Sequence, residues 1–126
     1  MALYKKHTDL PVYQVSFDAA KGVFLMSKRF PKEETYSLTD QARRSSRSVC
    51  ANIAEAWRKR RSEAFFVSTL NISEAEAAET QVWLQFAVEC GYVTAEDARP
   101  LYVKYDEIIA QLVHLIETPK PWILNK

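Results

Sequence analysis

Residues 36–61, YSLTDQARRSSRSVCANIAEAWRKRR, predict one long helix with three distinct faces. Successive residues of an α-helix are rotated by about 100°, which gives this segment an apolar face, a polar face about 80° wide and a basic face. A surface helix needs only an apolar face and a solvated one. The third face therefore suggests contact with another subunit or with a ligand. The apolar face comprises Leu38, Ala42, Val49, Ile53 and Ala56, the polar face Gln41, Arg44, Ser48, Asn52 and Glu55, and the basic face Arg43, Arg47 and Arg58.

Three other segments share the alternation of core positions four and three residues apart that is typical of bundled helices. Together the four predict helices over about residues 10–29, 38–60, 63–90 and 95–117. Ser62 and Thr94 are suited to begin the third and fourth helices, and Gly91 to follow the end of the third. Short connections between four amphipathic helices favour an antiparallel up-down-up-down, left-handed four-helix bundle. We therefore expect an all-α fold with a single domain over residues 1–126.

Three local features leave alternatives open. The connection around residues 58–62 contains neither Gly nor Pro, so the second and third helices are either separated by a turn or continuous. Pro100 lies in the second turn of the fourth helix, where it predicts a kink or a separate first turn. Trp122 in the tail docks either on the bundle or on a neighbouring subunit. In the third helix, we expect Ile72, Ala75, Val82, Trp83 and Phe86 to widen the buried stripe of Phe66, Leu70, Ala77, Leu84 and Ala87.

The composition is that of a globular domain of 126 residues, 48% hydrophobic and 26% charged, which is long enough to bury a core without disulfides or metals. No uncharged run approaches the length of a membrane span, and the N-terminus lacks the apolar segment of a secretory signal. Cys50 and Cys90 show neither zinc nor redox spacing, so we expect both to be small buried side chains. These features predict a cytoplasmic protein with no metal, no cofactor and no membrane role.

Charge is unevenly distributed although the net charge is only +1. Residues 43–61 contain seven Lys and Arg residues and one acid, whereas residues 62–117 contain ten acids and two basic residues. Such asymmetry indicates either an anionic partner or association of the basic and acidic surfaces of the protein itself. Phosphate binding needs positive potential and fixed donors, and Arg side chains supply both. The candidate nucleic-acid-binding residues are Arg43, Arg47, Arg58, Lys59, Arg60 and Arg61.

The polar face also has two interpretations. It could bind a ligand, or it could form a hydrogen-bond network between helices or subunits in which Arg44 pairs with Glu55 of the same or a neighbouring chain. We favour the network, and assign an assembly role to Gln41, Arg44, Ser48, Asn52 and Glu55.

Catalytic patterns are missing from the sequence. The metal enzymes built on helix bundles use Glu-x-x-His pairs, and the two histidines, His7 and His114, form none. The serines of the second helix have no histidine close by in sequence to act as a base, and no Gly-rich phosphate loop occurs. These observations predict a protein that is not an enzyme.

The segments DLPVYQ (Asp9–Gln14), FPKEE (Phe30–Glu34), YSLTDQARRSSRSVCANIAEA (Tyr36–Ala56) and CGYV (Cys90–Val93) resemble the bacterial four-helix-bundle proteins encoded in intervening sequences of 23S ribosomal RNA genes. The resemblance implies a protomer that assembles into a homopentamer. Accessory proteins of diversity-generating retroelements are similar, and those basic pentamers bind nucleic acid and a reverse transcriptase. The family usually has Gly where this chain has Ala56 and Arg58, so the bend that follows is expected to differ here.

Together these features predict a non-enzymatic, oligomeric protein that binds nucleic acid or serves as a ribonucleoprotein accessory, with the basic helix contacting the phosphate backbone of RNA or DNA. The alternative is a homo-oligomeric protein-interaction scaffold with no nucleic-acid role.

Overall fold

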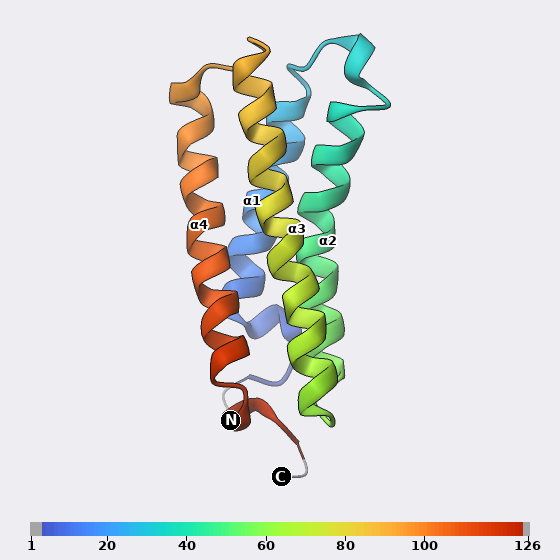
Figure 1. Ribbon diagram of the computed structural model, residues 1–126, viewed down its shortest axis with the longest axis vertical. Coiled ribbons are helices and arrows are strands. Elements are labelled where there is room, and N and C mark those ends of the chain that lie inside the picture. Colours follow the sequence, from blue (N-terminus) through green and yellow to red (C-terminus); the bar gives the residue numbers. More distant parts are fainter. Residues whose placement is uncertain (1–3, 125–126) are drawn as a thin grey trace.

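The computed structural model describes residues 4–124, and Figure 1 shows four long helices packed side by side. Consecutive helices run in opposite directions, so the chain passes up, down, up and down the bundle. Each of α1 and α3 packs against both α2 and α4, and the most extensive contact joins α2 to α3. Residues 4–124 contain no β-strand, and the predicted all-α four-helix fold is confirmed. The helices are α1 (Pro11–Ser27), α2 (Leu38–Arg58), α3 (Glu63–Glu89) and α4 (Ala95–Glu117), with short 3₁₀ helices at His7–Asp9, Lys32–Glu34 and Lys120–Trp122.

A tight turn separates α2 from α3. The Ser62 amide donates to the Lys59 carbonyl at 3.1 Å, which closes the turn. Ser62 then begins α3, because its hydroxyl oxygen accepts a hydrogen bond from the Phe65 amide at 3.2 Å. The turn and the Ser62 cap therefore separate α2 from α3 without a Gly or a Pro.

The other end of α3 is closed by Gly91, which has a φ of 78°. The Tyr92 amide donates to the Ala87 carbonyl and the Gly91 amide to the Val88 carbonyl, both at 2.9 Å. This pair of bonds is the Schellman motif, and it requires the left-handed conformation that glycine adopts without strain. The predicted role of Gly91 is confirmed.

Pro100 does not interrupt α4, which is continuous from Ala95 to Glu117. The helix begins at Thr94, whose hydroxyl oxygen accepts from the Asp97 amide at 3.0 Å. Pro100 lies close to that start and is exposed to solvent, so the carbonyl that loses its partner can be hydrated.

The core of α3 differs from the prediction. Ile72, Val82 and Phe86 were expected to widen the buried stripe but are 52%, 42% and 52% exposed, and Ala75 is exposed as well. Small polar residues occupy the contact between α2 and α3 instead. The Ser45 and Thr80 hydroxyls are 2.8 Å apart, and the Ser73 hydroxyl donates to the Val49 carbonyl at 2.8 Å. The larger apolar residues of α3 lie on another side of the helix and face outward.

The tail docks on its own bundle. Trp122 stacks on Tyr4, with ring centroids 5.8 Å apart, and contacts Trp57 at 5.9 Å. The Leu124 amide donates to the Arg60 carbonyl at 3.0 Å. The segment after α4 thereby covers the end of α2.

Candidate nucleic-acid interface

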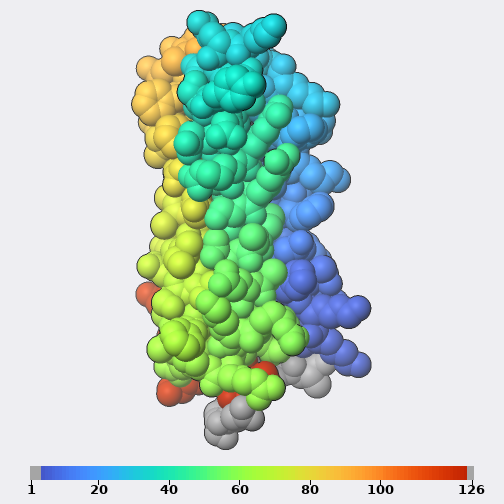
Figure 2. All heavy atoms as spheres, turned by 90° about the vertical axis from the view of Figure 1, so that its right-hand side faces the viewer, coloured from blue at the N-terminus to red at the C-terminus, as the bar shows by residue number. Residues whose placement is uncertain are grey.

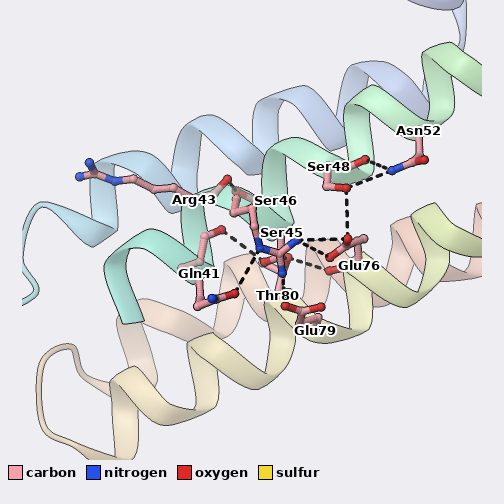
Figure 3. A network of polar contacts seen from close by, with 11 residues as sticks. Gln41, Arg43, Ser45, Ser46, Ser48, Asn52, Glu76, Glu79 and Thr80 are labelled. Carbon is pink, nitrogen blue, oxygen red and sulfur yellow. Dashed lines mark hydrogen bonds and ion pairs between the residues drawn. The ribbon is translucent and has the colours of Figure 1, made fainter. Parts of the chain in front are cut away.

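The polar face of α2 forms a network that joins α2 to α3 (Figure 3). Arg44 lies at its centre, where its guanidinium pairs with Glu76 at 3.3 Å and with Glu79. Arg44 Nε donates to Gln41 Oε1 at 3.2 Å. Glu76 also accepts a hydrogen bond from the Ser48 hydroxyl at 3.2 Å. The network therefore neutralises the charge of Arg44 within the chain.

The contacts at the C-terminal end of this polar face differ from the prediction. Asn52 Nδ2 donates to Ser48 Oγ at 3.0 Å and so extends the network, whereas Glu55 pairs with Lys59 at 2.8 Å. The expected pair of Arg44 with Glu55 does not form within this chain, because eleven residues of helix separate the two by about 16 Å along the axis. Whether this face organises an assembly stays a prediction.

The surroundings of Arg44 keep it charged. Partial burial acts to lower the pKa of Arg44, but Glu76 and Glu79 outweigh it and hold the pKa above its usual value. A guanidinium that two carboxylates already neutralise adds little positive potential for an outside anion.

Arg43 and Arg47 extend from another side of α2, toward α1. Their guanidinium carbons lie 4.7 and 5.8 Å from the centroid of the Phe24 ring, and Lys28 Nζ lies 4.9 Å from the same centroid. Figure 3 shows Arg43 pointing away from the network. Three cations therefore converge on one aromatic ring.

These cations form no ion pair with any carboxylate within residues 4–124. Arg43 Nε donates to Ser27 Oγ at 2.7 Å, which fixes the position of its side chain. A cation–π contact stabilises an exposed cation by about 0.5–1 kcal/mol, while the like charges repel one another. A phosphate group would relieve that repulsion and accept hydrogen bonds from the remaining donors.

Sequence reasoning had not assigned a site role to Phe24 or Lys28. Lys28 caps α1 four residues after Phe24, so their contact follows from helical spacing alone. Their approach to Arg43 and Arg47 depends on the pairing of α1 with α2, which only the folded structure shows.

The four predicted basic residues at the end of α2, residues 58–61, have different surroundings. Arg60 covers the Trp57 ring with its guanidinium carbon 3.6 Å from the centroid, and its Nε donates to the Trp57 carbonyl at 2.7 Å. Burial, followed by the charge of Arg58, lowers the pKa of Arg60. Lys59 is paired with Glu55. Arg58 and Arg61 remain exposed and form no ion pair within the described part of the chain.

Residues 4–124 contain no group of His, Cys, Asp and Glu side chains placed to hold a metal ion. Cys50 is buried as expected, and burial raises the pKa of its thiol to about 11. Cys90 is exposed, contrary to expectation, because it caps α3 beyond the last core position at Ala87. Among the described helices, none is both long and apolar enough to cross a membrane.

The fold and this surface define a class of protein, an all-α four-helix bundle with an open cationic face between α1 and α2. The chain belongs to the 23S rRNA-intervening sequence protein family, whose model matches residues 8–114, and the predicted family is confirmed. It is similar to a protein of unknown function from the S23 ribosomal protein family of Bacteroides thetaiotaomicron. That crystal structure aligns with a TM-score of 0.75 and 31% identity, covering 83% of this chain and 97% of that one. No curated protein matches this chain.

Proposed function

We propose that the protein is a non-enzymatic, oligomeric nucleic-acid-binding protein, a ribonucleoprotein accessory that contacts the phosphate backbone. The observation that carries the proposal is the convergence of Lys28, Arg43 and Arg47 on one ring without an ion-paired carboxylate. Guanidinium and ammonium groups are strong donors to phosphate oxygens. Contacts of this kind position a protein on nucleic acid without reading its sequence.

The six basic residues predicted from the sequence contribute unequally to this surface. Arg43 and Arg47 are its centre, and Arg58 lies within about 60° of Arg43 around α2 and about 22 Å further along the axis. Arg61 adds an exposed charge beyond the helix end. Lys59 and Arg60 are held by Glu55 and Trp57, so they contribute less.

The outer face of α3 supports the proposal that the protein is an oligomer. The family resemblance implies five subunits. Phe65, Ile72, Val82 and Phe86 form an exposed stripe with the spacing of a helix-packing seam, and Phe65 is 62% exposed. A stripe of this kind on a monomer marks an interaction site. We propose that it is covered by another copy of the chain, and a closed ring would then repeat the cationic face around one axis.

The same stripe also favours the alternative function, a homo-oligomeric scaffold that recruits protein partners and has no nucleic-acid role. Under that alternative, Arg43 and Arg47 would bind an acidic protein surface. The two functions differ in one observable, the affinity for RNA and DNA.

The test is fluorescence anisotropy of labelled RNA and DNA at about 50 and about 300 mM salt. We expect binding at low salt that weakens steeply at high salt and is indifferent to sequence. The double change Arg43→Gln and Arg47→Gln should weaken binding at least tenfold and make the salt dependence shallower, by about one unit of slope for each lost phosphate contact.

Arg99→Gln is the matched control for Arg47→Gln. Both arginines are exposed on long helices, but Arg99 lies in a hollow between α3 and α4, on the other side of the bundle. The control should leave affinity nearly unchanged. Equal effects of the two substitutions, or no binding at micromolar protein, would exclude the proposed function and favour the scaffold.

A further inference from the structure

We infer that the nucleic acid bound at this face is single-stranded, with its bases stacked on aromatic rings beside the cations; this inference rests on the proposed function. The rings are those of Tyr13 and Phe17 on α1, which stack on each other with centroids 6.0 Å apart and an interplanar angle of 28°. Phe17 is 51% exposed, so part of its side chain is accessible to a partner.

A shallow groove of about 270 Å³ connects these rings to Arg47, one of the three cations. Tyr13 and Phe17 line it from α1, and Arg47 lines it from α2. The remaining lining side chains are small, namely Ala20, Cys50, Ala51 and Ala54. Side chains of this size leave room for a planar group to lie across the helices and against the Phe17 ring.

The aromatic and basic residues follow the two helices in parallel rows. Along α1 and the residue that caps it, the steps from Tyr13 to Phe17, Phe24 and Lys28 are four, seven and four residues, which places all four on one side of the helix. On α2, Arg43, Arg47 and Arg58 occupy the facing side. Figure 2 shows α2 between α1 and α3, with its surface open along its length.

This arrangement suits a single strand better than a duplex. Proteins that bind single strands combine a positive groove, which follows the backbone, with aromatic side chains on which bases stack. A duplex keeps the flat faces of its bases stacked inside, so no base face is free to stack on an exposed ring, and its contacts with such a surface go mainly to phosphates. The exposed Phe17 ring can therefore stack on a base only when the nucleic acid is single-stranded.

The test compares unlabelled competitors against a labelled single strand of about 15 nucleotides. The competitors are single-stranded RNA, single-stranded DNA and a duplex of the same sequence, each dosed by phosphate concentration. Both single strands should compete better than the duplex. Phe17→Leu, which keeps an apolar side chain but removes the ring, should weaken single-strand binding about 5- to 100-fold and leave duplex binding unchanged. Phe17→Trp should restore or exceed the original affinity.

Tyr102→Leu is the control, since Tyr102 is an accessible ring in the hollow between α3 and α4. The inference fails if the duplex competes equally, or if Phe17→Leu and Tyr102→Leu act alike while the change of Arg43 and Arg47 to Gln still weakens binding; the proposed function then stands alone. If no binding is detected at all, both the inference and the proposed function are refuted. A lower oligomer mass for Phe17→Leu in light scattering would assign the ring to a subunit contact and overturn the inference.

Discussion

Two adjacent arginines of α2 have opposite electrostatic surroundings. Arg44 pairs with Glu76 and Glu79, whereas Arg43 lies over Phe24 beside another cation. Their side chains differ because consecutive helical residues point about 100° apart, so one faces α3 and the other faces α1. The formal charge of a segment therefore overstates the charge it offers to a partner.

At this scale we predict that Glu76 contributes more to stability than Glu79. The Glu76 side chain is 17% exposed and accepts hydrogen bonds from both Arg44 and Ser48, whereas Glu79 is 35% exposed and binds Arg44 alone. Glu76→Gln should lower the free energy of unfolding by about 1–2 kcal/mol, and Glu79→Gln by less than about 1 kcal/mol. Urea unfolding with an unchanged slope measures the difference. Equal losses would contradict the assigned network.

The Tyr92–Glu34 hydrogen bond should make stability depend on pH at both extremes. The Tyr92 hydroxyl donates to Glu34 at 2.7 Å. This bond, with further bonds from the Leu38 amide and Ser37, lowers the pKa of Glu34, and the same bond raises the pKa of Tyr92 to about 12. The Glu34 contribution is present above its unfolded pKa near 4.5 and is lost as pH falls through the lower folded value.

The Tyr92 contribution has the opposite sign. It is complete below the unfolded pKa near 10 and is lost as pH rises through about 12. Tyr92→Phe should therefore remove the dependence at high pH and weaken the one at low pH, because the bonds from the Leu38 amide and Ser37 remain. It should also raise the pKa of Glu34 measured by NMR and lower stability between these limits. An unchanged Glu34 pKa in that variant would show that the hydrogen bond does not form in solution.

At the scale of elements, the sequence predicts helices better than it predicts their neighbours. The observed helices begin and end within two residues of the predicted bounds, because caps such as Ser62 and Thr94 are local signals. The sequence pattern assigns Ile72, Val82 and Phe86 of α3 to the core, although they face outward. The pattern around an apolar residue beside a seam does not show which neighbour covers that residue. Similarly, Phe24 contacts Arg43 only because α1 packs against α2, and the sequence pattern does not show which helices pack together.

Gly91→Ala isolates the contribution of one helix end. Apart from Gly91 and its chain neighbours, no residue has an atom within 4 Å of the position that a Cβ would take, so the cost is that of the left-handed backbone with its φ of 78°. We expect a loss of about 1 kcal/mol in the free energy of unfolding, measured by denaturant titration. A neutral result would mean that the Schellman motif is not maintained in solution.

At the scale of the whole molecule, the two candidate surfaces lie on different sides of α2. The cationic face involves α1 and α2, and the exposed apolar stripe follows α3. Contact between copies through α3 would therefore leave the cationic face free. The proposed self-association and the proposed nucleic-acid binding would then be independent properties that separate substitutions remove.

Ile72→Glu should abolish self-association without unfolding the protomer. Ile72 is 52% exposed, so a carboxylate there is hydrated in the free chain but would be buried without a partner in the proposed interface. Size-exclusion chromatography with light scattering should report a reduced mass, and circular dichroism an unchanged helix content. Leu25→Glu is the control, at a 60% exposed position on α1. A wild-type protein that is already monomeric would refute the proposed oligomer.

The central claim, that nucleic acid binds the face between α1 and α2, is tested most directly by ultraviolet crosslinking to a single-stranded oligonucleotide, followed by mass spectrometry of the crosslinked peptides. We predict crosslinks in peptides of α1 and α2 that contain Tyr13, Phe17 or residues 43–58, and their loss when Arg43 and Arg47 become Gln. Crosslinks confined to α3 and α4, or none at concentrations where a known single-strand-binding protein is labelled, would contradict the claim.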